Sequence, residues 1–260
     1  MNTEMIFETH AHYDDSAFDD DRDALLSSFP KSGICCVINA SSSVDSIEKT
    51  MELAKKYPFI YAATGVHPDD VGNMNEDVFK RISALCDDEK TAAVGEVGLD
   101  YYWHDDNKEE QRTWFESFIG LAGDKGLPLI IHSRDAAEDT LNIVKGSHAG
   151  DIGAVMHCYS YSREMAKLFL DMGLYFGIGG VATFKNARKL VETLEYIPMS
   201  SILLETDCPY LAPVPYRGKR NCSLYIPYVA ERIAQIKNIS ADEVIRITNE
   251  NARRLFTKVK

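Results

Sequence analysis

The sequence lacks the long apolar runs, leader-like segments and linkers that mark several other classes of protein. No apolar run approaches the roughly 20 residues that a membrane-spanning helix needs. Residues 1–15 contain no basic segment followed by an apolar one, so we expect no secretory signal. No proline- or glycine-rich linker, low-complexity tract or short repeat interrupts the chain. We therefore expect residues 1–260 to form a single domain.

The six cysteines show neither the spacing of a metal finger nor that of a redox motif. Two of them, Cys35 and Cys36, are adjacent, and several others lie within apolar runs. This usage is typical of buried, reduced thiols, which favours a cytoplasmic protein over a disulfide-stabilised one.

An excess of basic residues is also absent. The chain has 40 acidic and 28 basic side chains, and its formal net charge is -12. Proteins that hold long duplexes through their phosphates are usually basic overall, so this charge argues against tight binding to duplex nucleic acid. It is compatible with a local cationic groove, or with an enzyme that acts only on a strand end.

Short β-branched runs alternate with amphipathic segments along the whole chain. Eight strands are predicted, at residues 5–10, 34–40, 60–66, 92–97, 127–132, 153–158, 174–179 and 201–206. The segments between them are long enough for the helical crossovers that parallel strands need. We predict an α/β fold, a single (β/α)8 TIM barrel, because closure removes the exposed edges of an open sheet.

The alternative fold is an open, doubly wound sheet. Such sheets usually carry a glycine-rich loop after the first strand, and here His10, Ala11 and His12 stand in that place.

Several helix boundaries can also be predicted from capping residues. Ser43 is expected to cap a helix with Ile47 and Met51 on its buried face. Ser162 is expected to begin a helix whose apolar stripe includes Leu168, and Ser240 to begin the last one.

Residues of the kinds that bind metal ions fall at the carboxyl ends of five predicted strands. In a closed barrel these ends meet at one mouth, where barrel enzymes carry their reactive groups. His10 and His12 are one residue apart, so extended backbone points both imidazoles the same way. The full set has four histidines and two carboxylates: His10, His12, Glu96, His132, His157 and Asp207.

We interpret this set as a metal centre rather than as polar residues that fill the barrel mouth, because burying so many ionisable groups without a cation is costly. Imidazole with carboxylate suits zinc and also accepts magnesium or manganese. We expect two divalent ions bridged by Glu96. The first would use His10, His12, Glu96 and Asp207, and the second Glu96, His132 and His157. Asp207 is expected to orient the attacking water and accept its proton, so Glu96 and Asp207 are the predicted catalytic carboxylates.

The segments around these residues resemble the TatD family, a branch of the amidohydrolase superfamily. They read THAH at 9–12, GVHP at 65–68, GEVGLD at 95–100, HSR at 132–134, HCYS at 157–160, ETDCPY at 205–210 and NARRLF at 251–256. The resemblance runs end to end and implies a β/α barrel, a divalent metal centre at the six positions and hydrolysis of phosphodiester bonds. Family members are described as deoxyribonucleases, several with exonuclease character. Glu8 and Tyr13 depart from the family's common residues, but neither is an expected ligand.

Four further residues are candidates for binding substrate: His67, Arg134, Arg217 and Arg220. His67 is expected to hold a phosphate or a leaving group, as the resemblance suggests, although Pro68 would also make it a turn residue. The arginines are suited to phosphate because guanidinium makes paired hydrogen bonds to it. A solvated loop explains the basic run 217–220 about as well.

Aromatic residues follow two of the candidate ligands: Tyr101, Tyr102, Trp103, Tyr159 and Tyr161. They are equally compatible with stacking on unpaired bases and with packing at the barrel rim.

Two cysteines and two histidines near the candidate site receive simpler interpretations. Cys158 and Cys208 neighbour ligands but are interpreted as packing residues, and His104 and His148 as exposed loop residues.

The leading hypothesis is a divalent-metal-dependent hydrolase that cleaves phosphodiester bonds at DNA ends, with no membrane and no obligate protein partner. A second is an amidohydrolase-type enzyme that acts on a small amide or phosphoester. Many such enzymes bridge two ions with a modified lysine from the fourth strand, where this chain has Glu96. A third is a non-catalytic metal-binding module. A degraded site would support it, but all six ligand positions carry residues that can bind metal.

Overall fold

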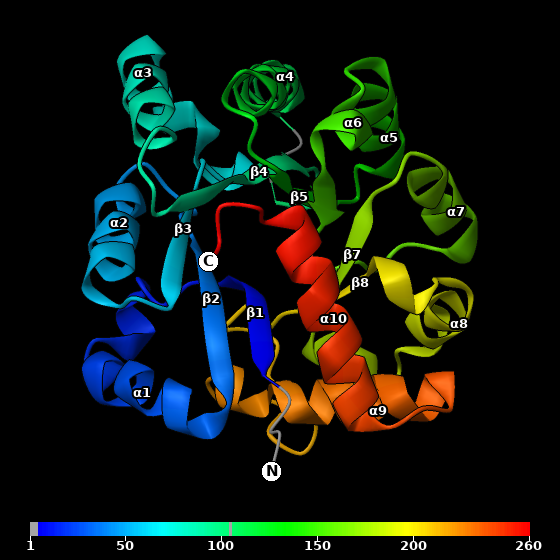
Figure 1. The fold of residues 1–260 in the computed structure, drawn as a ribbon. Coiled ribbons are helices and arrows are strands. Elements are labelled where there is room, and N and C mark those ends of the chain that lie inside the picture. Colours follow the sequence, from blue (N-terminus) through cyan, green and yellow to red (C-terminus); the bar gives the residue numbers. More distant parts are fainter. Residues whose placement is uncertain (1–4, 104–105) are drawn as a thin grey trace.

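The fold is a barrel of eight parallel strands surrounded by helices (Figure 1). The computed structural model describes residues 5–103 and 106–260. Each strand pairs with the next in sequence order: β1 (Ile6–Ala11), β2 (Ile34–Ala40), β3 (Ile60–Thr64), β4 (Thr91–Asp100), β5 (Leu129–Arg134), β6 (Ala154–Met156), β7 (Tyr175–Ile178) and β8 (Ile202–Leu204). The predicted TIM barrel is confirmed.

The barrel closes where the end of β1 meets the segment after β8. Ala11 and Cys208 form a parallel bridge. The backbone N–H of His12 donates to the Cys208 carbonyl at 2.9 Å, and that of Asp207 donates to the His10 carbonyl at 3.1 Å. Closure therefore joins the two candidate ligand segments that are farthest apart in sequence.

Ten α-helices lie among the described residues: α1 (Arg22–Ser28), α2 (Ser46–Lys56), α3 (Glu76–Leu85), α4 (Lys108–Lys125), α5 (Ala137–Gly146), α6 (Ala149–Ile152), α7 (Arg163–Asp171), α8 (Arg188–Tyr196), α9 (Ile226–Lys237) and α10 (Ala241–Leu255). Short 3-10 helices are η1 (Ser16–Phe18), η2 (Phe29–Ser32), η3 (Pro68–Asn73), η4 (Gly180–Thr183), η5 (Met199–Ser201) and η6 (Ser223–Tyr225). None of the described helices has both the length and the apolar character that a membrane crossing demands. The cytoplasmic location stays a prediction.

The strand boundaries correct one expectation. Glu96 does not end the fourth strand, because β4 continues to Asp100 and pairs Gly98 with His132 of β5. Gly98 has φ +145°, and a Cβ there would lie 2.0 Å from the His132 carbonyl oxygen. A glycine at this position therefore lets β4 pass close to the backbone of a candidate ligand.

The predicted caps are confirmed for two helices and wrong for a third. At the starts of α7 and α10, Ser162 Oγ accepts the backbone N–H of Met165, and Ser240 Oγ accepts that of Glu243. For α2 the capping position is Asp45, and Ser43 instead accepts from the backbone N–H of Ser46 within the preceding turn. Leu168 was expected on a buried stripe but is 44% exposed.

The end of the barrel that faces the viewer in Figure 1 is covered by α10. Phe256, directly after this helix, stacks on Phe7 of β1 at 5.9 Å between ring centroids. It belongs to a cluster with Ile38, Ile130 and Leu203, which come from β2, β5 and β8. Because these strands are not neighbours in the sheet, the cluster fills the inside of the barrel. Apolar packing thus closes this end and leaves the carboxyl ends of the strands for the site.

Asn251 ties α10 to the start of β8. Its side-chain amide, fully buried, donates to the carbonyls of Met199 at 2.7 Å and Ile202 at 2.9 Å. We expect Asn251→Ala to lower the free energy of unfolding by about 2 kcal/mol, because two buried carbonyls lose their donor. This corresponds to roughly 4 to 8 °C in Tm, measurable by thermal denaturation. Asn186→Ala, at an exposed position, is the control and should change Tm by about 1 °C or less.

Candidate metal centre

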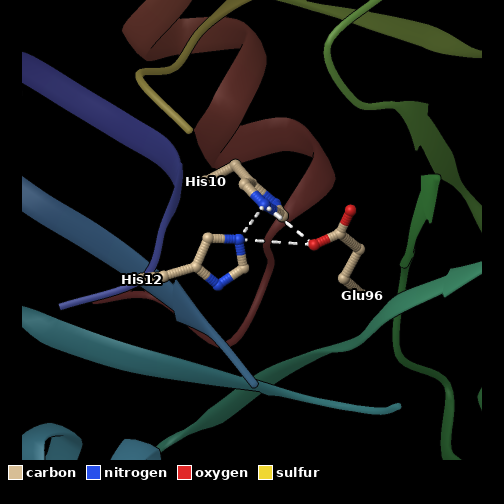
Figure 2. Close-up of side chains that lie close together, drawn as sticks. All are labelled: His10, His12 and Glu96. Carbon is tan, nitrogen blue, oxygen red and sulfur yellow. Dashed lines mark hydrogen bonds and ion pairs between the residues drawn. The ribbon is translucent and has the colours of Figure 1, made fainter. Parts of the chain in front are cut away.

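Four ligand-type atoms meet beside the end of β1. His10 Nε2 and His12 Nε2 lie 3.0 Å apart, and each faces Glu96 Oε2, at 3.3 and 3.4 Å (Figure 2). Asp207 Oδ1 lies 3.6 Å from His10 Nε2 and 3.4 Å from His12 Nε2. Ligands about 2.1 Å from a tetrahedral zinc ion are separated from one another by roughly 3.4 Å. These five separations therefore fit a group of atoms that holds one cation.

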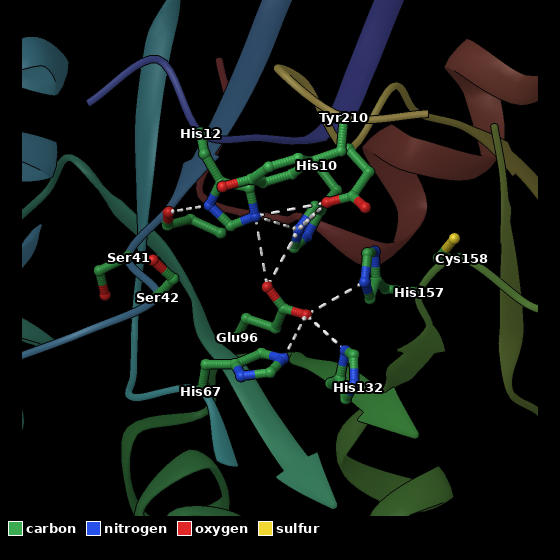
Figure 3. Close-up of polar contacts among 12 residues, drawn as sticks. His10, His12, Ser41, Ser42, His67, Glu96, His132, His157, Cys158 and Tyr210 are labelled. Carbon is green, nitrogen blue, oxygen red and sulfur yellow. Dashed lines mark hydrogen bonds and ion pairs between the residues drawn. The ribbon is translucent and has the colours of Figure 1, made fainter. Parts of the chain in front are cut away.

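A second group forms around the other oxygen of the same carboxylate. Glu96 Oε1 lies 2.8 Å from His132 Nδ1 and 3.0 Å from His157 Nε2 (Figure 3). His10, His12 and Glu96 have the mutual spacing of metal ligands, and so do Glu96, His132 and His157, while Asp207 has it with His10 and His157. Glu96 thus presents one oxygen to each pair of histidines. The residues present fit a divalent metal centre.

The electrostatics of these side chains show why the site favours a cation. Burial alone would raise the pKa of Glu96, but the charges of His157 and His10 hold it well below its ordinary value. Burial alone would lower the pKa of all four histidines in the two groups, yet nearby carboxylates raise it for three of them: His12, His132 and His157. For His10, burial prevails and lowers the pKa. Without metal, protons on the histidines balance the carboxylates, a role that a bound cation would take over.

Two residues of the segments after β6 and β8 have left-handed backbone at the site. Asp207 has φ +57° and Cys158 has φ +45°. Aspartate tolerates this region better than most residues, and at Cys158 the conformation is held by a backbone N–H that donates to Glu205 Oε1 at 2.6 Å. Such outliers gather where the surrounding structure fixes a functional geometry.

His67 lies beside the second group. Its Nε2 is 3.7 Å from Glu96 Oε1, and its ring meets that of His132 edge to face at 4.2 Å. Burial lowers the pKa of His67 to about 3, so the ring is neutral at physiological pH. Because Nδ1 accepts the backbone N–H of Asp69 at 3.1 Å, the ring proton is on Nε2, which makes His67 a donor towards the site.

A cleft of about 640 Å³ opens over both groups. Arg134 lines it. Arg217 and Arg220 are not among the described residues that line it: Arg217 lies over the Phe184 ring at 4.3 Å, and Arg220 pairs with Asp21 at 2.6 Å. Of the predicted arginines, the structure brings only Arg134 to the site.

The aromatic residues divide into two kinds. Tyr159 is buried, Tyr161 is half-buried and bonded to Ser133, and Tyr101 donates to Asp139 at 2.7 Å. These three pack the rim. Tyr102 and Trp103 are exposed.

The remaining neighbours of the site fit their simpler interpretations where the structure describes them. Cys208 is fully buried, and the sulfur of Cys158 points away from the cluster (Figure 3). His148 is exposed, and His104 lies outside the described residues.

Comparison with known proteins identifies the family. The protein-family model described as TatD related DNase matches residues 7–257 of this chain. The chain belongs to the TatD family. It is 42% identical to the uncharacterized metal-dependent hydrolase YabD of Bacillus subtilis over 97% of this chain and 99% of that one. It is 30% identical to the 3'-5' ssDNA/RNA exonuclease TatD of Salmonella typhimurium, over 98% and 100%.

A solved structure supports the same assignment. The crystal structure of YJJV, a TatD homolog from Escherichia coli k12, matches with a TM-score of 0.92 and 27% identity over 99% of both chains. This TatD barrel is therefore a metal-dependent hydrolase, and its cluster of histidines and carboxylates can bind metal.

Three carboxylates of this TatD site were missed in the sequence: Glu8, Asp100 and Glu205. Asp100 Oδ2 lies 3.0 Å from His132 Nε2. Glu205 Oε1 lies 3.4 Å from His157 Nδ1, close enough for an ion pair but without hydrogen-bond geometry. A signal was available, since Glu8 and Glu205 each precede a ligand by two residues and Asp100 follows Glu96 by four. In extended backbone that spacing points side chains the same way.

Glu8 is a special case among these carboxylates. It is fully buried below His10, where its Oε1 accepts the backbone N–H of Thr206 at 2.9 Å. Burial raises the pKa of Glu8 to about 8. The side chain thus supports the backbone that carries both ends of the site.

Asp100 contacts His132 of the second group, so a substitution there should change metal affinity without altering the candidate ligands of the first group. Asp100→Asn keeps the size of the side chain but removes the charge that orients His132. We expect the affinity for zinc or manganese to fall roughly 10- to 100-fold, measured by competition with a chelator. Asp151→Asn, at an exposed aspartate, is the matched control. An unchanged affinity in Asp100→Asn would contradict this role.

Metal binding should also depend on pH. A metal ion binds neutral imidazole, so loading must release protons from the histidines whose pKa is raised: His12, His132 and His157. We expect the apparent affinity to increase between about pH 6 and pH 8. Calorimetry in two buffers of different ionisation enthalpy should detect the released protons. His148→Ala should leave the profile unchanged, and an affinity independent of pH would count against the assignment.

Proposed function

We propose that the chain hydrolyses phosphodiester bonds at the ends of single-stranded nucleic acid, as a DNase with exonuclease character, using two divalent ions. Residues 1–260 would act as one catalytic domain. The observation that supports two ions is that Glu96 turns Oε1 to one pair of histidines and Oε2 to the other. The nucleic-acid substrate is supported by the family and by the relative named as an ssDNA/RNA exonuclease.

The two groups of atoms would hold zinc, magnesium or manganese. The first group is His10, His12, Glu96 and Asp207, and the second is Glu96, His132 and His157. Ions bound there supply an activated water and stabilise the charge on the phosphoryl oxygens.

The side chains around the ions have distinct tasks. Both carboxylates line the cleft, but the Asp207 side chain is 17% exposed and that of Glu96 only 3%, so Asp207 is the more accessible of the two. It would orient the attacking water and accept its proton. His67 would donate its Nε2 proton to a phosphate oxygen. Arg134 would bind a neighbouring phosphate.

Changes to the two catalytic carboxylates test this function. Wild-type protein with magnesium, manganese or zinc should degrade a labelled single-stranded oligonucleotide, and a chelator should abolish the activity. We expect no detectable cleavage by Glu96→Gln, because both groups lose their shared ligand. Asp207→Asn should be slower by roughly 10² to 10⁴-fold, because its base is lost.

His148→Ala, an exposed histidine outside the site, is the control and should retain full activity. Full activity in Glu96→Gln would refute the mechanism. Turnover of cyclic amides without any phosphodiester cleavage would instead assign the chain to the amide-hydrolysing enzymes of this barrel.

A further inference from the structure

Three exposed apolar side chains line the cleft: Trp103, Tyr210 and Leu211. Seven large hydrophobic side chains are exposed among the described residues. Two of them, Met5 and Leu168, lie elsewhere. The other five stand in the two loops that follow β4 and β8: Tyr102, Trp103, Tyr210, Leu211 and Val214. An exposed apolar patch of this kind marks a binding surface more often than a packing requirement.

The loop after β4 forms a shelf that is fixed to the metal centre. The Tyr102 and Trp103 rings meet edge to face at 4.7 Å, and the Arg134 guanidinium lies 3.9 Å above the Tyr102 ring. Asp100 Oδ1 accepts the backbone N–H groups of Tyr102 and Trp103, at 2.9 and 3.0 Å. The other oxygen of Asp100 faces His132. One carboxylate thus sets the position of the aromatic shelf relative to a ligand.

The loop after β8 also contributes to the lining of the cleft, through Tyr210 and Leu211. The buried Asn221 amide donates to the Tyr210 carbonyl at 2.8 Å, which fixes the loop from below. Leu211 has φ +55°, a conformation strained for leucine, and it is nevertheless exposed. Its carbonyl lies against Gly180, where a Cβ would come within 2.0 Å. The fold holds an apolar side chain at the cleft against a local cost, which is a sign of function.

The charges in the cleft are unsuited to binding a long run of phosphates. Arg134 is the only lysine or arginine among the described residues that line it. Carboxylates outside the proposed ligand set line it as well: Asp14, Asp15, Asp69, Asp70 and Asp100. Beyond the phosphate at the metal centre, a nucleic-acid backbone would meet mostly negative charge. Affinity for the flanking nucleotides must therefore come from another part of the substrate.

We propose that Trp103 with Tyr102, and Tyr210 with Leu211, form two surfaces on which unpaired nucleobases stack on either side of the scissile phosphate. This inference rests on the proposed function. The enzyme then selects single strands because their bases are free to stack, and it needs few phosphate contacts.

The proposal is tested with two substrates of equal length and charge. One is an unlabelled octamer of thymidine nucleotides. The other is an octamer in which every nucleotide is a base-free tetrahydrofuran residue. Products are separated by chromatography and identified by mass. Wild-type protein should cleave the thymidine octamer at least about tenfold more efficiently, in kcat/KM, than the base-free one.

Variants at the two surfaces identify the residues responsible. Trp103→Ala and Tyr210→Ala should each lower kcat/KM for the thymidine octamer by roughly 5- to 100-fold. Trp103→Phe and Tyr210→Phe keep an aromatic ring and should retain most of the activity. Leu168→Ala, an exposed apolar residue on α7, is the control and should change it by less than about twofold. The proposal would be overturned if the wild type cleaved the two octamers equally well. It would also be overturned if Trp103→Ala and Tyr210→Ala both changed kcat/KM as little as Leu168→Ala does.

Fluorescence separates this proposal from the proposed function, because it needs no hydrolysis. The chain has two tryptophans, Trp103 and Trp114. Binding of the thymidine octamer to Glu96→Gln should quench tryptophan emission, and the quench should vanish when Trp103→Phe is added. Quenching without cleavage by the wild type would preserve base stacking and reject the hydrolytic function. Cleavage by the wild type without a Trp103-dependent quench would support the hydrolytic function and reject base stacking.

Discussion

The arrangement of side chains at the mouth of this barrel depends on the charge balance around one buried carboxylate. Glu96 is almost excluded from solvent; its Oε2 faces two histidine nitrogens and its Oε1 three, that of His67 included. A carboxylate in such surroundings is stable only if positive charge reaches it, from protons on the histidines or from metal ions. The histidines that supply this charge lie in or directly after three strands, β1, β5 and β6. The geometry of the mouth and the chemistry proposed for it both follow from this constraint.

The barrel fold could be predicted because it depends on patterns that are local in the sequence. Alternating strands and helices predicted the barrel, and the positions of His10, His12, His132, His157 and Asp207 at strand ends predicted their convergence. Glu96 lies within the cluster, although its strand was predicted to end too early. The length of β4 depends on pairing with β5 and on the close approach at Gly98, which no propensity of the β4 segment reveals.

Long-range partners limited the prediction of the remaining residues. Arg220 is held by Asp21, about 200 positions earlier, and the sequence does not show that this pairing draws it away from the cleft. The exposure of Tyr102 and the burial of Tyr159 are likewise decided by tertiary packing. By contrast, the spacing of Asp100 and Glu205 from the candidate ligands was visible, and a systematic comparison of alternate positions would have found both.

Asp100 gives the metal centre and the aromatic loop a common support. One of its oxygens faces a histidine of the second group and the other fixes two backbone amides of the loop. Effects of one ligand on another are thermodynamically reciprocal. If a bound cation orders the loop through Asp100, it raises the affinity of the loop for a nucleobase. A nucleobase bound on the loop would then raise the affinity for the cation by the same factor. With the proposed metal and substrate bound, the centre would therefore have a higher affinity for the metal than it has without substrate, and substrate would protect it against a chelator.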